Sequence, residues 1–507
     1  MRPPGPPGGP FGPAALRTVA ALAREGVPQT TLRLAEEYGP AVAFANPARS
    51  LGLDAAGWTF LTDPDDVQHV ATTAAANYRE RFLPDGYAFA TDGKGLLASG
   101  GEYNARHRRL CQPAFARPRE LRAFASAVTG TAEELGRQWA SAAPGAGGAL
   151  EVDAALQMQR LTLDIIGKVA FSHDFRQVAA SGRELRGEAA EAESALLSAV
   201  NRFGEALAEV FVAPLPLLRA LERVGHPSVR KLRRSLATIH AEMAVVIETR
   251  RARHAEEGAG GGAGRPVDLL DALMTARDAD GRAMSDAELF EDVHDIMGAG
   301  HETTASTLTA ALYSVARHPE VAAQLRAELD AALPGGRAPT FDDLPALRYT
   351  GQVVNETLRL YPAIPIFPRV AAGEDVLPSG YRVPAGEVVF LSSFAMGRLG
   401  RLWDGDPLAF DPDRFAPERE ARRHRFAFVP FGVGPRMCLG AGFAQASLAL
   451  ALATLCARFE FDVAAERGGG GGGTPPPAVL DIDYDITMNF GGVEGGVRLA
   501  VRERQRG

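Results

Sequence analysis

Apolar and polar residues along this chain repeat mainly with the period of an α-helix. From about residue 64 to residue 319 the pattern is helical, and Ala, Leu, Glu and Arg dominate it. A shorter helix is predicted over Thr31–Tyr38, and strands are predicted within 41–62, 376–391 and 482–501. We therefore predict a mainly α fold with a smaller β portion.

The longest predicted helix runs from Ser285 to about Ala316. Ser285 and Glu288 have the spacing of a capping box, which starts a helix, and Pro319 follows the helix end. At about 1.5 Å per residue the helix is roughly 46 Å long, enough to cross a domain. Its middle, GAGHETT over 298–304, holds two glycines that each cost roughly 1 kcal/mol relative to alanine. We expect these glycines to thin the helix, widen its hydrogen-bond ladder and let a ligand approach the backbone.

The recognisable motifs run from residue 101 to residue 440 and belong to one set, which predicts one large catalytic domain over 30–503. A Pro/Gly-rich lead segment over 1–29 precedes this domain. Two low-complexity stretches, 258–264 and 468–477, are predicted to be flexible surface loops and not domain linkers.

The composition is ordinary for a globular protein. Of 507 residues, 46% are apolar and 23% are charged, and the net charge of -8 argues against nucleic-acid binding. Three cysteines without a CxxC pair fit a reducing compartment. No segment is predicted to span a membrane, because the longest apolar run, after Cys438, contains Gln445 and Ser447. We expect a soluble, cytoplasmic protein, with a plastid or a membrane surface (peripheral attachment) as the alternative locations.

A glycine-rich loop around Cys438 carries the strongest chemical signal. The loop reads FGVGPRMCLG, from Phe431 to Gly440. Gly434 permits a turn that a Cβ would block, and Gly440 permits close approach to a ligand. Arg436 and the amides of the apolar helix that follows would favour a charged thiolate over a thiol. Such a loop suits a thiolate held against a large planar iron cofactor.

This loop resembles the heme-binding loop of the cytochrome P450 (cytochrome P-450) family of heme-thiolate monooxygenases, FxxGxRxCxG, and all five fixed positions match. The resemblance covers roughly residues 30–503. It implies the fold of that family, with a long central helix over the heme, heme b (iron protoporphyrin IX) as the cofactor, and Cys438 as the ligand of its iron. The alternative is a buried structural cysteine, which is our interpretation of Cys111 and Cys456.

The middle of the long helix is similar to the AGxET pattern of the same family. The resemblance implies that Thr303 lies beside dioxygen and helps to deliver protons, and that Glu302 belongs to the proton relay. Ala299 and Gly300 would line the same site. The alternative is helix packing by small residues together with a surface acid. We interpret His301 as structural, without a metal role.

Three further residues resemble a buried ion network of the family. Glu356 and Arg359 match its ExxR pair, and Arg414 follows in the stretch FDPDRF. The resemblance implies that the three support the fold and take no part in catalysis. Loss of one partner would strand a buried charge at a cost of several kcal/mol.

The two propionates of heme need cations. Arg436 is the first candidate, Arg108 in the stretch GEYNARHRRLCQPAF is the second, and Arg369 is the third. The alternative for Arg108 and Arg369 is a solvated surface charge. The tryptophan common in the family four residues before Arg108 is Asn104 here, which removes one usual propionate donor, although its amide can also donate.

The resemblance implies an enzyme, a monooxygenase that inserts one oxygen atom of O2 into an apolar organic substrate. Fatty acids, terpenoids and carotenoids are the expected classes, and 82–97, 364–367 and 487–490 are the expected pocket linings. No flavin-binding or iron–sulfur sequence is present, so an external reductase or ferredoxin is expected to supply electrons. Its predicted docking patch consists of Arg106, Arg109, Arg422 and Arg423.

Two other functions stay open. A heme-thiolate enzyme could instead rearrange or dehydrate a hydroperoxide without O2 or a reductase, although Glu302 and Thr303 argue against this. The chain could also be a non-catalytic heme-binding sensor, which the intact motif of the central helix disfavours.

Overall fold

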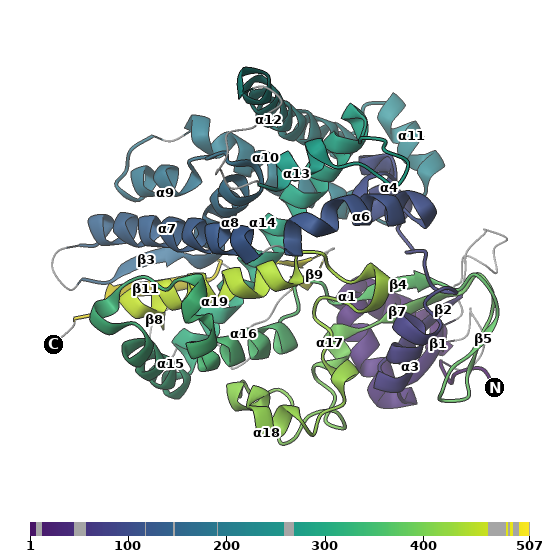
Figure 1. Ribbon diagram of the computed structural model, residues 1–507. Coiled ribbons are helices and arrows are strands. Elements are labelled where there is room, and N and C mark those ends of the chain that lie inside the picture. The colour runs from purple at the N-terminus through teal and green to yellow at the C-terminus, as the bar shows by residue number, and fades with distance from the viewer. Residues whose placement is uncertain are drawn as a thin grey trace. The chain divides into compact units, whose positions relative to one another are not determined.

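The computed structural model describes residues 1–6, 13–44, 57–116, 118–144, 148–189, 191–257, 268–464, 483–484, 487–489 and 496–505. The chain forms two compact units (Figure 1). Helices dominate and the sheets are small, which confirms the predicted fold class. The predicted loops at 258–264 and 468–477 lie outside the described residues, and the domain boundaries at 30 and 503 stay a prediction. Unit 1 comprises Met1–Leu83, Gln352–Cys438 and Pro477–Glu494, and unit 2 comprises Pro84–Gly351, Leu439–Pro476 and Gly495–Gly507.

Unit 1 is built on a four-stranded sheet with the strand order β1-β2-β7-β4. Strands β2 and β7 are parallel, and the other two pairs are antiparallel. Phe60 of β2 stacks on Phe390 of β7 with ring centroids 5.1 Å apart, and Trp58 meets Phe390 edge-on at 5.5 Å. Aromatic pairs of this kind hold one face of a sheet in register. The strands are β1 (Ala41–Phe44), β2 (Trp58–Leu61), β4 (Phe367–Val370) and β7 (Val388–Leu391).

The first helix of unit 1 is longer than predicted. It begins at Pro13 instead of Thr31, and it is kinked where Gly26 adopts a φ of 80° two residues before Pro28. The kink interrupts the helical period of the sequence, which conceals the first half of the helix. The helices of unit 1 and its strands outside the four-stranded sheet are α1 (Pro13–Tyr38), α3 (Pro64–Gln68), a π-helical turn (His69–Thr73), β5 (Asp375–Val376), β6 (Arg382–Val383), α17 (Ser393–Met396), α18 (Pro417–Glu420), β9 (Asp483–Tyr484) and β10 (Met488–Asn489), together with 3-10 helices at Pro412–Phe415, Arg425–Ala427 and Gly434–Arg436.

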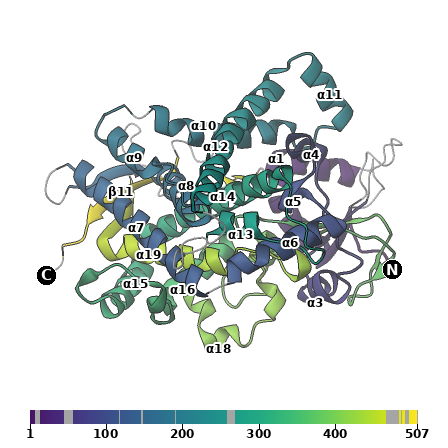
Figure 2. The same ribbon diagram turned by 45° about the horizontal axis from the view of Figure 1, so that its top comes forward.

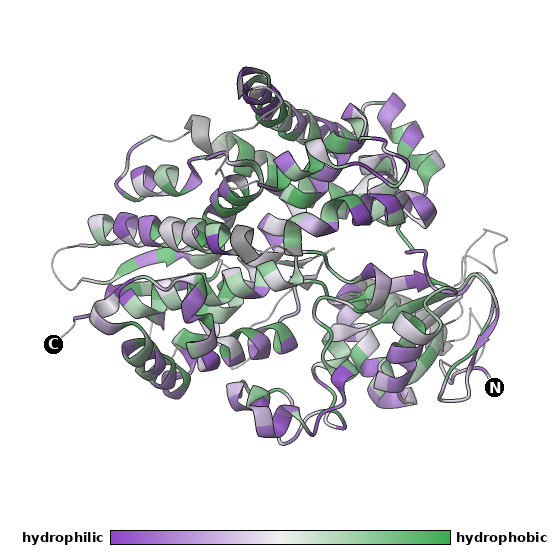
Figure 3. Ribbon diagram, in the orientation of Figure 1, coloured by the Kyte–Doolittle hydropathy of each residue, from purple (hydrophilic) through white to green (hydrophobic). Residues whose placement is uncertain are grey.

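Unit 2 is helical except for a three-stranded antiparallel sheet of order β3-β11-β8. Among its helices, α12 carries hydrophilic residues over much of its length (Figure 3). The helix α16 (Arg348–Leu360) begins in unit 2 and ends in unit 1. The elements of unit 2 are α4 (Asp85–Thr91), α5 (Gly95–Ala98), α6 (Gly101–Ala116), α7 (Pro118–Ala142), β3 (Leu150–Asp153), α8 (Ala154–Phe171), α9 (Gln177–Leu185), α10 (Glu191–Val210), α11 (Leu215–Arg223), α12 (Pro227–Glu257), α13 (Leu269–Thr275), α14 (Asp286–Arg317), α15 (Pro319–Ala332), α19 (Ala441–Arg458), β8 (Phe459–Val463) and β11 (Arg498–Glu503).

The long helix α14 lies at the centre of unit 2 and packs against α8, α5, α12, α15 and α19 (Figure 2). Its predicted start is confirmed, because Ser285 Oγ accepts from the Glu288 amide at 3.3 Å and Glu288 Oε2 accepts from the Ser285 amide at 2.7 Å. The helix is α-helical without interruption to Arg317. The predicted widening of its hydrogen-bond ladder around the two glycines is therefore wrong.

The apolar helix after Cys438 is α19. Among the described helices it is the one with the length and composition to cross a membrane, but 61% of it is buried inside the protein. It packs against α7, α14 and α15. These contacts make it a core helix of unit 2, as the polar residues within it suggested.

Candidate functional site

The loop that precedes Cys438 is held by backbone geometry that requires glycine. Gly434 has a φ of 73°, and a Cβ at this position would collide with the carbonyl oxygen of Ala71. The Met437 amide donates to the Gly434 carbonyl at 3.0 Å, and the Cys438 amide donates to the Phe431 carbonyl at 2.9 Å. The loop therefore closes on itself and fixes the direction in which Cys438 leaves it.

Cys438 differs from the other two cysteines in its exposure. Cys111 and Cys456 are buried, and burial raises the pKa of both thiols, to about 12 for Cys456. Cys438 is exposed, so its sulfur is accessible to a group from outside the chain. The predicted structural role of Cys111 and Cys456 fits their burial.

Two predicted propionate partners are buried cations of unit 1. Arg436 is 7% exposed, and its carbonyl accepts from Arg81 Nη2 at 3.0 Å. Arg369, on β4, is 2% exposed, and its Nη1 donates to the Pro368 carbonyl at 2.8 Å. Neither is a solvated surface charge, which excludes the alternative proposed for Arg369.

The third predicted propionate partner, Arg108, is half-buried on α6 of unit 2. Asn104, one turn earlier, is buried and donates from Nδ2 to the Leu96 carbonyl at 2.8 Å. That bond joins α6 to α5, so the amide is already used within the chain. Gly440, also in unit 2, is the residue before α19 begins.

The middle of α14 is more exposed than the part of the helix that follows it. Ala299 and Glu302 are exposed and Thr303 is half-buried, whereas every residue from 304 to 315 is buried. Thr303 Oγ1 donates to the Ala299 carbonyl at 2.7 Å, which orients the hydroxyl along the helix. The helix thus presents a short segment of small residues, one hydroxyl and one carboxylate.

The two glycines in this segment have different surroundings. A Cβ on Gly300 would lie 2.7 Å from Ile166 Cδ1 of α8, so glycine at this position lets the two helices pack closely. A Cβ on Gly298 would meet nothing within 4 Å. His301, between them and Thr303, is buried with Nδ1 3.1 Å from Thr162 Oγ1. Burial lowers the pKa of His301 to about 4, so the ring is neutral near pH 7, as a structural role requires.

The structure brings Glu356, Arg359 and Arg414 together in unit 1. Arg359 Nε and Nη2 each donate to one oxygen of Glu356 at 2.6 Å, and both side chains are fully buried. Arg414 Nε lies 3.5 Å from Glu356 Oε1, which also accepts from the Asp411 amide at 2.8 Å. Burial raises the pKa of Glu356, and its two arginines and the Asp411 amide oppose that rise.

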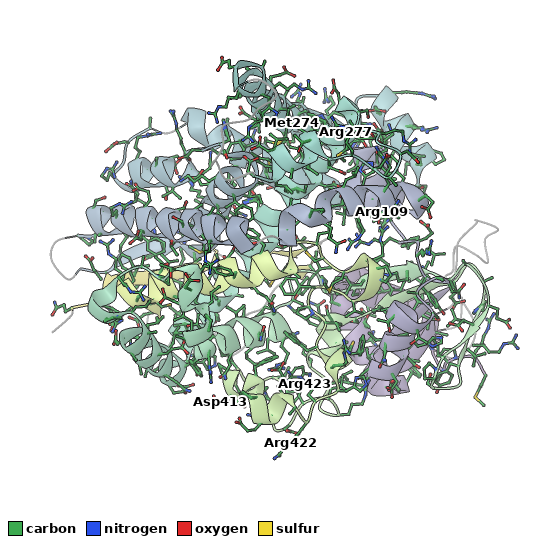
Figure 4. The ribbon with its side chains drawn as sticks, viewed as in Figure 1. Arg109, Met274, Arg277, Asp413, Arg422 and Arg423 are labelled. Atoms are coloured by element: carbon green, nitrogen blue, oxygen red, sulfur yellow. The ribbon has the colours of Figure 1, made fainter. Side chains whose placement is uncertain are left out.

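The predicted docking patch is only partly exposed. Arg423 lies over the Trp403 and Phe415 rings at 4.7 and 4.5 Å, with 9% of its side chain exposed. Arg106 is paired with acids of unit 2 and has 15% of its side chain exposed. Arg109 and Arg422 are exposed (Figure 4). The prediction is therefore wrong for Arg106 and Arg423, because their charges are satisfied within the fold.

The predicted pocket linings are described in part. Ile364 and Phe367 are half-buried in unit 1, and the Ile364 carbonyl accepts from Ser393 Oγ at 2.8 Å. The Met488 amide of β10 donates to the Ala363 carbonyl at 3.0 Å, which places residues 487–489 beside that segment. Residue 490 lies outside the described residues.

Comparison with known proteins identifies the family to which the chain belongs. A sequence model of the family described as Cytochrome P450 matches residues 3–469. This chain belongs to the cytochrome P450 family. Pentalenene oxygenase of Streptomyces avermitilis is 31% identical over 371 residues, which cover 73% of this P450 and 74% of that protein. Protein LUTEIN DEFICIENT 5, chloroplastic, of Arabidopsis thaliana is 31% identical and covers 80% of this chain and 65% of its own length. Leukotriene-B4 omega-hydroxylase 3 of Mus musculus is 29% identical over a region that covers 72% of this chain and 68% of that protein.

Members of this family bind heme b, and this P450 is an oxygenase. The residues of unit 1 fit that cofactor. An accessible sulfur at Cys438 provides the ligand, and the buried cations Arg369 and Arg436 provide charge for the propionates. The tight glycine turn at Gly434 leaves no room for a side chain on the inner side of the loop.

One set of contacts between α6 and α14 was not predicted from the sequence. His107 of α6 lies against Asp292 of α14, and the two positions are 185 residues apart. The only signal was the spacing of Glu288, Asp292 and Asp295, which places three acids on one face of a predicted helix. Nothing in the sequence indicated which bases would face them.

Proposed function

We propose that this P450 is a monooxygenase that inserts one oxygen atom of O2 into an apolar substrate. The observation that carries the proposal is the middle of α14, where Ala299 and Glu302 are exposed and Thr303 is half-buried directly before the continuously buried stretch 304–315. A hydroxyl and a carboxylate one residue apart are suited to passing protons at a site lined by small side chains. When bound, heme with a thiolate ligand supplies the oxidising power and favours O–O cleavage.

The residues of the cysteine loop are assigned roles in holding heme. Cys438 is the iron ligand, and Phe431, Gly434 and Gly440 give the loop its shape. Arg436, Arg369 and Arg108 are the partners of the propionates. The burial of Arg436 and Arg369 supports this assignment, since a buried guanidinium is favourable where an anion accompanies it.

Thr303 and Glu302 are assigned the proton delivery. The Thr303 hydroxyl donates its own proton to the Ala299 carbonyl, so its lone pairs are available to accept a hydrogen bond. The Glu302 carboxylate is exposed and can exchange protons with solvent. Together they would carry protons from water to the site where O2 is cleaved, while Ala299 and Gly300 leave room beside the helix.

The proposed substrate is a fatty acid, a terpenoid or a carotenoid. The names of two relatives state oxygenation of pentalenene and omega-hydroxylation of leukotriene B4. The apolar segment around Ile364 and Phe367 supports an apolar substrate. An external reductase or ferredoxin would supply two electrons, with the exposed Arg109 and Arg422 as candidates for its docking.

The test uses the purified holoprotein. Fatty acids, terpenes and carotenoids are screened for an optical shift of the heme band, and compounds that bind are incubated with NAD(P)H, a redox partner and 18O2. We expect one 18O atom in the product and no turnover without reductant. A product that forms without NAD(P)H or that lacks 18O would overturn the proposal in favour of hydroperoxide rearrangement.

A further inference from the structure

A cluster of charged side chains joins α6 to the first half of α14 within unit 2. The His107 side chain is fully buried between the two helices. Its Nδ1 lies 2.8 Å from Asp292 Oδ2, and its Nε2 lies 3.4 Å from Glu288 Oε1. Both ring nitrogens therefore face carboxylates of α14.

This geometry selects one protonation state of the ring. A neutral imidazole has one N–H and one lone pair, so one of its nitrogens would oppose a carboxylate with a lone pair. The imidazolium has two N–H groups and can donate to both Asp292 and Glu288. Tyr103 covers one face of the ring, with centroids 4.0 Å apart, and thereby excludes water from that side.

Other charged and titratable groups complete the surroundings. Arg106 Nη1 donates to the same Glu288 oxygen at 2.7 Å, and Arg106 Nε donates to Asp278 at 2.7 Å. Cys111 Sγ, also on α6, lies 3.7 Å from Asp292 Oδ2. Glu288 is contacted by both Arg106 and His107. Asp292 therefore relies more than Glu288 does on the charge of His107.

Burial and charge act on the ring in opposite directions. Burial disfavours the imidazolium, but Asp292 and Glu288 outweigh it, and the pKa of His107 is raised above its ordinary value. Burial also raises the pKa of Asp292, and the contact with His107 opposes that rise. The contribution of His107 to the contact of the two helices is thus fully present below about pH 6.5 and is lost as the pH rises through the raised pKa of the histidine.

We propose that His107 is a positioning residue, whose imidazolium ties α6 to α14 and so fixes the next residue, Arg108. The attachment of α6, and with it the retention of heme, would then weaken as the pH rises. The second part rests on the proposed role of Arg108 as a propionate partner. The first part concerns α6 and α14 alone.

The attachment of α6 is tested by hydrogen exchange of the full-length holoprotein, read by mass spectrometry at about pH 6 and about pH 9 and corrected for the intrinsic rate. We expect the α6 amides to exchange about tenfold faster at the higher pH, because one charge-assisted bond is lost. In His107→Gln the exchange should be fast at both values. Asp292→Asn is a second variant with the same expectation, and His226→Gln, at an exposed histidine, is the control. Equal pH dependence in wild type and His107→Gln would overturn the proposal.

The link to Arg108 is tested by transfer of heme to apomyoglobin from the same samples. Wild type should release heme several-fold faster at the higher pH, whereas His107→Gln and Arg108→Gln should release it fast at both. If amide exchange of α6 depends on pH but His107→Gln releases heme at the same rates as the wild type, the positioning role is overturned. Failure of Cys438 as the iron ligand would be recognised separately, since the carbon monoxide spectrum would change while the exchange of α6 would not.

Discussion

Arg359 and Glu356 form a two-bonded ion pair in which Nε and Nη2 each donate to a separate carboxylate oxygen at 2.6 Å, with both side chains fully buried. The same guanidinium also donates to the carbonyls of Gly397 and Ala409, at 2.5 and 3.0 Å. Glu356→Gln removes the charge that compensates two buried arginines. We expect unfolding in denaturant to require about 3 kcal/mol less free energy, the cost of breaking a buried pair.

An exposed pair provides the control for that measurement. Arg122 Nη2 lies 2.9 Å from Asp342, with side chains 58% and 69% exposed. Asp342→Asn should change the free energy of unfolding by less than about 1 kcal/mol, because solvent screens the pair. Similar losses in the two variants would show that the burial of Glu356 does not set its energetic importance.

The glycines of α14 give a second prediction about stability. The Cβ added by Gly298→Ala would have no neighbouring atom within 4 Å. This substitution should stabilise the protein by about 1 kcal/mol, because alanine is the better helix former. Gly300→Ala places a Cβ 2.7 Å from Ile166 Cδ1 and should not show this gain. Chemical denaturation of the two variants measures the difference.

A double-mutant cycle separates the clash from other effects at residue 300. Ile166→Val removes the Cδ1 atom, so Gly300→Ala should cost about 1 kcal/mol less in the Ile166→Val background than in the wild type. Additive effects of the two substitutions would contradict the close packing of α8 against α14.

The features predicted from sequence are those that local chemistry determines. The capping box at Ser285 and the glycine turn at Gly434 depend on a few neighbouring residues, and the structure contains both. Whether the arginines of the predicted docking patch are exposed depends on residues far from them in the sequence. Arg422 and Arg423 are adjacent and chemically identical in the sequence, yet only Arg423 lies over the ring of Trp403. Such outcomes are set by tertiary contacts between residues that are far apart along the chain.

The hydroxyl of Thr303 is predicted to keep electron use coupled to product. Thr303→Ala removes the hydroxyl, so NAD(P)H consumption should continue while product per NAD(P)H falls at least about tenfold and hydrogen peroxide rises. Thr303→Ser should retain coupling. Thr309 is the control, because it makes the same bond to the residue four before it, at 2.8 Å to the Ala305 carbonyl, but is buried. Loss of coupling in Thr309→Ala as well would mean that helix structure, not proton delivery, explains the effect.

The sulfur of Cys438 is predicted to determine the spectrum of the reduced protein with carbon monoxide. An anionic sulfur ligand gives a strongly red-shifted band, and Cys438→Ser should abolish it. Cys456→Ala serves as the control, because Cys456 is buried with its pKa raised to about 12 and remains a thiol. If Cys438→Ser keeps the band, or binds heme as well as the wild type, Cys438 is not the ligand.

The buried ring of His301 predicts a loss of stability in acid. Its pKa falls from an ordinary value of about 6.5 in the unfolded chain to about 4 in the folded protein, so the unfolded chain binds the proton more readily. Stability is therefore greatest above about pH 6.5 and declines as the pH falls toward 4. The gap between the two values corresponds to about 3 kcal/mol.

His301→Gln should remove that part of the acid dependence, since glutamine does not titrate. The measurement is the free energy of unfolding of wild type and variant between about pH 7 and about pH 4, with the exposed His226→Gln as the control. As the pH falls, the free energy of unfolding should decrease less in His301→Gln than in the wild type. This is the reverse of the dependence expected for His107, which stabilises at low pH, so the two histidines are distinguishable by sign alone. Parallel curves for wild type and His301→Gln would show that burial does not hold the ring neutral in the folded protein.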